Sequence, residues 1–437
     1  MSDSIKSPEY MRSFQCLGGS CEDTCCQHWD IHLDKYHYDL LRERVEKHPR
    51  EAKLVKQHIK LQDAQFTSDK NYAYIQLNKA GYCPFLTKKG FCHLHQKFDV
   101  TPLSDICAFF PRVLSKVNGV IELTGALSCP EVVRKCLFST DEEQAFVDYP
   151  IAQLPRDEHI PITRQCHDIG DSFYHQHFLR VRDVMLGLLK NDDYALETRL
   201  YFLANFNYRI ATHYHQHAAE NNKILNSEIE RIQSDATLKS LDSYYEQFNS
   251  AEPVAIVVIQ AILRLQIQHA NQDKLSKLAT VIFDTYRAQM DHVDDLEVYG
   301  DNLPPEPLWQ GFQQNWDKIN ARFGIQLENY LSRYLANCLQ REWFISLPDP
   351  FVYIHMLTIR MAILRFLIVS HPEIINLTTS QQDKATVDNA FAEYVVQVIY
   401  LFARSIDHNL AFLQVIYEAI NEQQMMSFDY SMPFIKF

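Results

Sequence analysis

The chain has 437 residues, 46% of them hydrophobic, and carries 55 acidic against 42 basic side chains, a formal net charge of −13 at pH 7. This length and apolar content supply two or three ordinary cores. The acidic balance argues against nucleic-acid binding, because phosphate contacts normally need a basic face. The 11 glycines form neither a G-x-G-x-x-G nor a G-x-x-x-x-G-K-[ST] loop, which argues against the common nucleotide-binding folds.

Residues 1–147 are predicted to form a small α+β cysteine-rich domain. We expect helix over 34–62 on either side of Pro49, and a short strand at 71–77. A hairpin over 83–94, turning at Lys88-Lys89-Gly90, would bring Cys83 and Cys92 together.

A second hairpin is predicted to join 113–117 to 120–127 through Asn118-Gly119, a preferred pair for a tight type I′ turn. Its second strand leads to Cys129, which we expect at the N-terminus of a helix beginning at Pro130, where the helix dipole favours a thiolate. Cys136, two turns further on, is predicted to be a packed core thiol.

The segment 148–169 contains several prolines and little periodicity, and is predicted to be a linker. Residues 170–437 are predicted to form a larger all-helical domain, which makes the protein mainly α. Asp349-Pro350 is a plausible N-cap and first turn for a helix from Phe351. The predicted helical runs, from apolar spacing, cover 172–190, 195–220, 228–248, 253–270 and 386–420.

No membrane span is expected. The apolar run 253–265 is too short to cross a bilayer, and the run 351–369 is interrupted by Arg360 and Arg365. Both are predicted to be buried core helices.

Cysteine distribution is the main chemical feature. Nine of the 11 cysteines lie in the first 136 residues, beginning with the run CLGGSCEDTCCQHW. The N-terminal run has no apolar signal segment, so we expect a reducing, cytoplasmic location in which disulfides are rare. The odd total and the adjacent Cys25-Cys26 point the same way. Metal or cluster ligation is therefore preferred, with inert or redox thiols as the alternative.

Eight cysteines are predicted as metal ligands. Cys21 and Cys25 would share one face if their segment is helical, and Cys26 would then face another side. The set allows two tetrahedral zinc sites, one four-iron cluster with spare thiols, or two clusters, and spacing alone does not choose. The predicted ligands are Cys16, Cys21, Cys25, Cys26, Cys83, Cys92, Cys107 and Cys129.

The spacing departs from two familiar sites. No paired C-x-x-C knuckles of a zinc ribbon occur. A C-x3-C-x2-C signature of radical S-adenosylmethionine enzymes begins with Cys21 and Cys25 but has His28 at its third position. Other non-thiol candidates are His93 and His95, although packing is the commoner role for a histidine. For Arg112, next to the Cys107 segment, we expect a structural salt bridge.

The blocks FQCLGGSCEDTCCQHW, YCPFLTKKGFCHLHQKF, DICAFFPRV and LSCPEVV, in this order, resemble the flagellin lysine N-methylase family. That family is itself similar to small cysteine-rich zinc- or iron-chelating proteins. Two later runs, ENYLSRYLANC (328–338) and LFARSIDHN (401–409), resemble its C-terminal helices. The likeness therefore covers most of the chain.

The resemblance implies a protein-lysine N-methyltransferase of the bacterial flagellum. It would transfer methyl groups from S-adenosylmethionine to lysine ε-amines of flagellin, or of another lysine-bearing protein, with an iron-sulfur cluster (4Fe-4S, or zinc as the alternative) in the cysteine domain. Radical and displacement routes stay open. The alternatives are a non-catalytic metal-binding interaction module and a redox protein.

Methyl transfer by displacement needs a deprotonated lysine and therefore a desolvating site or a general base. Tyr330 and Tyr334 share a helix face, and Asp407 and His408 lie in the other family-like run, so these four are candidates. The sequence assigns neither the catalytic residue nor the S-adenosylmethionine pocket.

Overall fold

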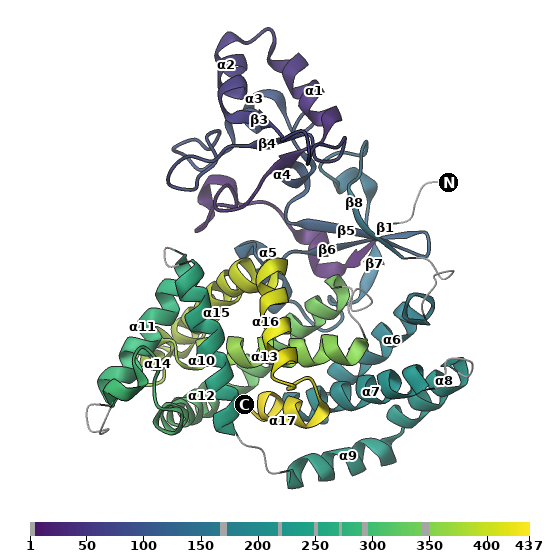
Figure 1. The fold of residues 1–437 in the computed structure, drawn as a ribbon, viewed down its shortest axis with the longest axis vertical. Helices are drawn as coiled ribbons and strands as arrows, with labels where there is room; N and C mark the ends of the chain where they lie inside the picture. Colours follow the sequence, from purple (N-terminus) through teal and green to yellow (C-terminus); the bar gives the residue numbers. More distant parts are fainter. Residues whose placement is uncertain are drawn as a thin grey trace. The chain divides into compact units, whose positions relative to one another are not determined.

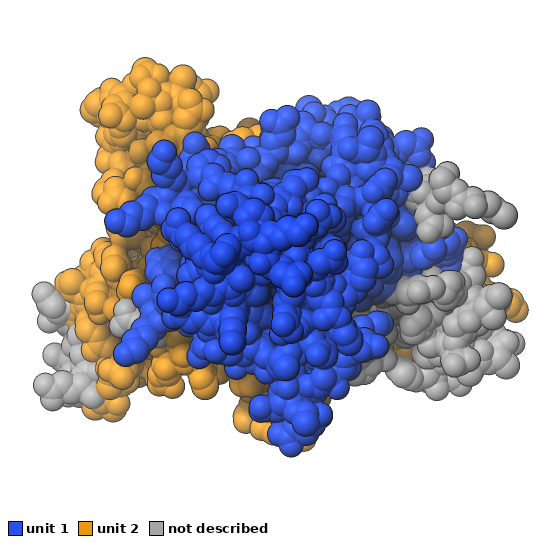
Figure 2. Space-filling view, turned by 90° about the horizontal axis from the view of Figure 1, so that it is seen from above, with its two compact units in different colours: residues 1–135, 139–167 blue, residues 136–138, 168–437 orange. Residues whose placement is uncertain are grey.

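The computed structural model describes residues 5–166, 173–216, 221–248, 252–270, 273–290, 296–342 and 349–437. The chain is mainly helical, as predicted, and it divides into two compact units, coloured separately in Figure 2. Unit 1 comprises residues 1–135 and 139–167, and unit 2 comprises residues 136–138 and 168–437.

A five-stranded mixed sheet organises one part of unit 1, in the order β7-β1-β6-β5-β8. Strand β1 runs parallel to β6, β5 and β6 form an antiparallel hairpin, and β8 runs parallel to β5. The strands are β1 (Ile5–Pro8), β5 (Arg112–Val117), β6 (Val120–Gly125), β7 (Phe146–Asp148) and β8 (Ile162–Cys166).

The β5–β6 hairpin confirms the predicted Asn-Gly turn. Asn118 (φ 50°) and Gly119 (φ 85°) both lie in the left-handed region that a type I′ turn requires. Helix α5 (Pro130–Leu137) then begins at Pro130, which places Cys129 at its N-terminus as predicted. Cys136 is fully buried, also as predicted.

A small sheet forms the other part of unit 1. It consists of β2 (His32–Leu33), β4 (Ala73–Ile75) and β3 (Ile59–Leu61), in that order. Figure 1 shows helices α1 (Lys35–Val45), α2 (Pro49–His58) and α3 (His93–Phe98) around it. The predicted helices on either side of Pro49 and the strand within 71–77 are confirmed.

The predicted 83–94 hairpin is reduced to a tight loop. Leu86 pairs with Cys92 in a single isolated bridge, and Gly90 (φ 77°) donates its N–H to the Thr87 carbonyl at 3.0 Å. The turn was therefore predicted correctly, but strands extending from it were not.

The segment 148–169, predicted as a linker, instead contributes β8 to the large sheet. Leu114 of β5 is in register with Ile162, and the Thr163 hydroxyl donates to the Leu114 carbonyl at 2.8 Å. An edge strand in parallel pairing carries no hairpin turn to mark it, and the surrounding prolines dominate the local pattern.

Unit 2 is helical throughout its described residues. Its helices are α6 (Phe173–Leu189), α7 (Leu196–Gln216), α8 (Asn221–Ile232), α9 (Asp235–Gln247), α10 (Glu252–His269), α11 (Lys274–Gln289), α12 (Pro305–Arg341), α13 (Pro350–Val369), α14 (Pro372–Leu377), α15 (Lys384–Phe402), α16 (Leu410–Glu422) and α17 (Phe428–Lys436). The predicted run 228–248 is broken between α8 and α9. The run 386–420 is broken by a π-turn at Ala403–Asp407, which ends before α16.

Helix α13 is the core of unit 2. By length and hydropathy it is the one described helix that could cross a membrane, but all 20 of its residues are buried inside the protein. It contacts α7, α10, α12, α15 and α17. Its Arg360 and Arg365 pair with Glu342 at 2.6 Å and Glu197 at 2.5 Å. These features support the predicted core helix.

The N-cap of α13 gives a testable prediction. The Asp349 side chain accepts a hydrogen bond from the Val352 N–H at 2.9 Å, as the sequence predicted. Replacing Asp349 with Ala should lower the free energy of unfolding by about 1 kcal/mol, because it removes the acceptor of an otherwise unpaired helix N–H. Chemical denaturation measures this, with Asp349→Asn as the control that keeps a capping oxygen. Equal loss in both variants would contradict the capping role.

Candidate functional site

The loop from Cys16 to Cys26 is not helical. Its one helical segment is a 3-10 turn at Gly18–Ser20, so the condition for a shared helix face of Cys21 and Cys25 is not met. The loop is closed against the 83–92 turn: a Cβ on Gly19 would lie 2.1 Å from the Lys89 carbonyl oxygen and 2.7 Å from the Phe91 ring. Because glycine has no side chain, Gly19 lets two cysteine-bearing segments come into contact.

One set of four thiols gathers around this loop and the start of α5. The Gly18 N–H lies 3.4 Å from Cys16 Sγ, and the Cys21 thiol donates to the Asp23 carbonyl at 3.0 Å. Burial and the neighbouring Cys16 raise the pKa of Cys21. Cys16 also lies close enough to raise the pKa values of Cys25 and Cys129.

An ion pair fixes α5 against this loop. Arg134 of α5 donates to Glu22, which follows Cys21, at 2.5 Å. Cys129 at the start of α5 is thereby held near Cys16 and Cys21, the two thiols that act on its pKa. The outer quartet is our name for Cys16, Cys21, Cys25 and Cys129.

A second set of four thiols surrounds Cys26. The Cys83 N–H donates to the Cys26 carbonyl at 2.9 Å, and Cys92 is carried back toward Cys83 by the Leu86 bridge. Cys107 lies in the first turn of α4 (Asp105–Phe109), where its N–H donates to the Ser104 hydroxyl at 3.3 Å. The inner quartet is our name for Cys26, Cys83, Cys92 and Cys107.

Charge effects within the inner quartet show how close its members are. Cys26 raises the pKa values of the other three, after the larger effect of burial, and Cys92 and Cys83 add to the effect on Cys107. Burial brings the pKa of Cys83 to about 12. A thiolate at that position is therefore unstable unless a bound cation compensates its charge.

The adjacent Cys25 and Cys26 belong to different quartets although their thiols are in hydrogen-bond contact. That contact lowers the pKa of Cys26 to about 7 and raises the pKa of Cys25. Beyond Cys26, the thiols that act on Cys25 are Cys16 and Cys129. The eight predicted ligands are thus brought together as four plus four.

The thiols are not gathered as tightly as a zinc ion would hold them. With a Zn–S bond of about 2.3 Å, tetrahedral sulfurs lie about 3.8 Å apart. Within the described residues, three ligand atoms that all lie within 4.8 Å of one another occur only at Asp34, His37 and Asp105. Sulfurs that bind different irons of a cluster are farther apart than sulfurs on a single ion.

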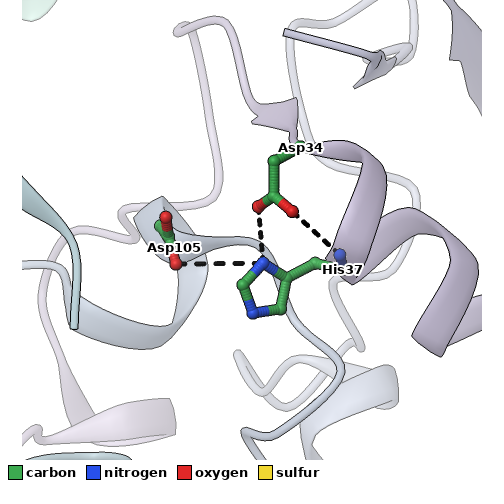
Figure 3. A group of neighbouring side chains, drawn as sticks. All are labelled: Asp34, His37 and Asp105. Carbon is green, nitrogen blue, oxygen red and sulfur yellow. Dashed lines mark hydrogen bonds and ion pairs between the residues drawn. The ribbon is translucent and has the colours of Figure 1, made fainter. Parts of the chain in front are cut away.

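The group of Asp34, His37 and Asp105 is shown in Figure 3. Asp34 caps α1 and lies 2.5 Å from His37 Nδ1, while Asp105 Oδ1 is 3.9 Å from the same nitrogen. Arg156 also donates to Asp105 and to the Leu103 carbonyl. Because the carboxylate already has a cationic partner, we interpret the group as an ion-pair network that fixes α4, and with it Cys107.

The other sequence candidates in unit 1 have structural partners. His93 Nε2 lies 3.0 Å from Glu51, and His28 (φ 57°) donates its N–H to the Gly81 carbonyl at 2.8 Å. His95 is exposed, 3.9 Å from Asp99.

The predicted salt bridge of Arg112 is wrong. Its guanidinium lies over the Phe14 ring, 5.0 Å from the centroid, and among the described residues no ion pair is found for it. A cation–π contact leaves no charge pattern in the sequence, so it could not be predicted there.

Two of the base candidates in unit 2 meet in a buried cluster. Tyr334 of α12 donates to Asp407 Oδ2 at 2.8 Å, and Arg360 of α13 lies 3.3 Å from Asp407 Oδ1. Arg360 also forms two hydrogen bonds with Glu342, at 2.9 and 2.6 Å. Asp407 ends the π-turn, an irregularity that is common at functional positions. Because Tyr334 and Asp407 are 0% and 3% exposed, a substrate lysine cannot reach them.

The two buried carboxylates of this cluster, Asp407 and Glu342, have pKa values shifted in opposite directions. Burial raises the pKa of Asp407 despite Arg360, and burial also raises the pKa of Tyr334 and lowers that of His408. For Glu342, burial alone would raise the pKa, but Arg360 and Arg341 outweigh it and hold the pKa at about 2. Glu342 is therefore the carboxylate that most depends on the arginines. Sequence analysis missed it, although Arg360 within an apolar helix indicated that a buried partner was needed.

The depressed pKa of Glu342 predicts a pH effect. Its ionised form stabilises the fold above its ordinary pKa near 4.5, and this contribution is lost as pH falls from about 4.5 to about 2. In Glu342→Gln, we expect the fall in unfolding free energy over this range to be shallower, by up to about 1.4 kcal/mol per pH unit. Urea denaturation at a series of pH values measures the difference. Parallel curves for both proteins would contradict it.

Unit 2 also contains a groove of about 620 Å³. One wall is the middle of α12, including Tyr330, and another is the start of α15; Phe138 closes one side. Its charged lining residues are Arg322, Arg333, Lys384 and Asp388. Of the four sequence candidates, Tyr330 is thus the one that lines a cavity of ligand size.

Comparison with known proteins identifies the helical part. Residues 182–433, more than half of the chain, match the family model described as the FliB lysine N-methylase C-terminal domain. The chain belongs to the FliB lysine N-methylase family. The match includes α12, the π-turn and both family-like runs, and thus confirms the resemblance inferred from the sequence.

Relatives of this family share part of the chain. The chain is 28% identical over 138 residues to the lysine-N-methylases of Salmonella typhimurium and Salmonella choleraesuis, and this stretch is 31% of this chain and 33% of each relative. It is 29% identical over 150 residues to the flagellar biosynthetic protein FliU of Salmonella muenchen, which is 31% of this chain and 79% of that protein. The similarity thus spans about a third of the lysine-N-methylases. No solved structure matches the chain.

Proposed function

We propose that the protein is an S-adenosylmethionine-dependent protein-lysine N-methyltransferase with an iron-sulfur centre in unit 1. Its substrate would be flagellin or another lysine-bearing protein of the cytoplasm. The observation that carries the proposal is the family match over residues 182–433. The printed names of the relatives, lysine-N-methylase and flagellar biosynthetic protein, support the reaction and the substrate class.

The groove in unit 2 is the place we assign to the methyl donor. S-adenosylmethionine carries a carboxylate, a flat base and a sulfonium, and the groove offers a partner for each. Arg322 and Lys384 are cations that suit the donor's carboxylate. The rings of Phe138 and Tyr330, 5.7 Å apart, provide an apolar surface for its flat purine ring. Asp388 can face a sulfonium or a lysine ammonium.

The acceptor lysine must lose its proton before its nitrogen attacks the methyl group. Asp388 is the carboxylate of the groove and is the base that we assign. Tyr330 has its pKa raised by burial and accepts a hydrogen bond from Gln326 at 2.7 Å, so it remains a neutral phenol that orients a ligand. Both residues act by holding the amine and directing its proton.

Eight cysteines in two groups of four fit iron-sulfur ligation by their chemistry, since thiolates are the ligands of such clusters. When bound, a cluster would supply electron transfer or an iron that binds the donor. Buried Cys83 and half-buried Cys129, whose pKa values are raised by burial, would gain from a cation that stabilises their deprotonated form.

A methylation assay tests the proposal. The purified protein is incubated with flagellin and S-adenosylmethionine carrying a labelled methyl group, and lysine methylation is read by mass spectrometry. We expect Asp388→Asn to lower kcat by about 100-fold, in the range typical of a lost general base. Lys384→Met should instead raise the KM for the donor.

The control is Asp301→Asn, which removes an exposed carboxylate of unit 2 outside the groove. We expect it to leave both constants unchanged. Label transfer that is insensitive to Asp388→Asn and Lys384→Met would remove the groove from the account. Absence of transfer to any lysine would leave the alternatives of a metal-binding module or a redox protein.

A further inference from the structure

We propose that unit 1 holds two separate metal centres, an outer one bound by Cys16, Cys21, Cys25 and Cys129, and an inner one bound by Cys26, Cys83, Cys92 and Cys107. The proposal deepens the metal-binding part of the function above and does not depend on methyl transfer. Of the arrangements that the spacing left open, it favours two centres over one cluster with spare thiols.

The first step is the division of the thiols. Within the inner quartet, Cys83 donates its N–H to the Cys26 carbonyl, and Cys26, Cys83 and Cys92 share one hydrophobic cluster. The effects of these three thiols on the pKa of Cys107 agree with its place beside them. In the outer quartet, Cys16 acts on the pKa values of all three other members. Across the two quartets, the thiols of the adjacent Cys25 and Cys26 are in contact.

Local backbone structure supports the same division. The Cys83 N–H bonds to the Cys26 carbonyl, and the Leu86–Cys92 bridge closes the loop that carries two inner thiols. The outer thiols are tied by a different contact, the Arg134–Glu22 ion pair that holds α5 beside Cys21. Each quartet therefore has contacts of its own, and the packing of Gly19 against the 83–92 turn joins the two.

The second step concerns the role of the inner centre. Cys83 is buried in the hydrophobic cluster of the small sheet, and Cys26 and Cys92 pack against that cluster. Cys107 joins them from α4, which the network of Asp105 and Arg156 holds in place. Three chain segments thus carry the four inner thiols: the segment of Cys26, the 83–92 loop and α4. A metal that joins separate segments beside a hydrophobic core is typical of a structural centre.

The outer centre is more accessible. Cys16 and Cys25 are exposed, and the loop that carries them is pressed against the 83–92 turn through glycines rather than through an apolar core. A centre there can meet solvent, a reductant or a substrate. In the inner quartet Cys107 is also exposed, but Cys83 is buried in the small-sheet core, so the inner centre has fewer exposed ligands. We therefore assign any reactive role to the outer centre.

The adjacent cysteines offer a matched experiment. Cys25→Ser and Cys26→Ser differ by one position, yet the first removes an outer ligand and the second an inner one. Protein is purified without oxygen, and iron, acid-labile sulfide and zinc are measured per chain, together with the electron paramagnetic resonance spectrum of the reduced sample. The control Cys136→Ser alters a thiol of neither quartet.

Wild type and Cys136→Ser should hold twice the metal of either single variant. Each single variant should lose a different spectroscopic or metal component, and the double variant should lose both. One centre per wild-type chain, or the same component lost in both single variants, would overturn the proposal. If Cys26→Ser fails to fold, as judged by circular dichroism, Cys16→Ser and Cys25→Ser must still retain the inner half of the metal.

The methylation assay is independent of this result. Two centres without label transfer would remove the enzyme function and keep the present proposal. Label transfer by a protein with a single centre would keep the enzyme function and remove the proposal of two centres.

Discussion

Replacing Arg360 with methionine is expected to lower the free energy of unfolding by about 3–5 kcal/mol, because it removes the cation beside buried Asp407 and leaves Glu342 with Arg341 alone. Arg360 is the shared partner of Glu342 and Asp407, and its side chain is 4% exposed. Methionine has a similar length and fills much of the same space. The lost free energy of unfolding therefore measures the removed charge and hydrogen bonds more than a new cavity.

The matched control is Arg180→Met on α6. Arg180 is exposed and forms one hydrogen bond, 2.7 Å from Asn226. We expect a change below about 0.5 kcal/mol there, as for most surface substitutions. Urea denaturation measures both values, and hydrogen exchange assigns the change to unit 2. A cost for Arg360→Met no larger than that of Arg180→Met would show that the cluster is not held by this arginine.

Metal removal is expected to have the largest effect on unit 1. Binding free energies of roughly 10–16 kcal/mol have been found for structural zinc in small domains, and such energy is folding energy. Stripping the metals with a chelator should therefore abolish protection from hydrogen exchange over α1–α3 and the small sheet. Unit 2 should keep its protection, because its core around α13 contains none of the eight predicted ligands.

The chelated protein also provides its own control. Iron with sulfide is returned to one sample and zinc alone to another. The metal that restores protection from hydrogen exchange in unit 1 is the one that the site holds. Unchanged exchange over the small sheet after complete metal loss would contradict a structural inner centre. Loss of protection in both units would show that the effect is not confined to the cysteine-rich part.

Much of the fold could be predicted from local patterns. Asn118-Gly119 specifies a tight turn by its backbone preference, and Asp349 specifies a helix start by offering an acceptor to unpaired N–H groups. The long amphipathic runs gave the helices of unit 2. Strand β8 was missed because its pairing with β5 depends on residues about 50 positions away.

The candidate site was predicted in its chemistry but not in its arrangement. Eight cysteines could be named as ligands, yet their division depends on how Gly19 packs under Phe91 and how Arg134 ties α5 to Glu22. Those contacts join distant segments, and spacing carries no information about them. For the same reason Tyr334 and Asp407 looked like accessible bases, whereas helix packing places both in a closed cluster.

The most direct test of the central claim is mass spectrometry of flagellin after incubation with the metal-loaded protein and labelled S-adenosylmethionine. The account predicts labelled methyl groups on lysine side chains, with transfer reduced by about 100-fold in Asp388→Asn and unaffected in Asp301→Asn. Unlabelled lysines after incubation with a fully loaded protein would contradict it.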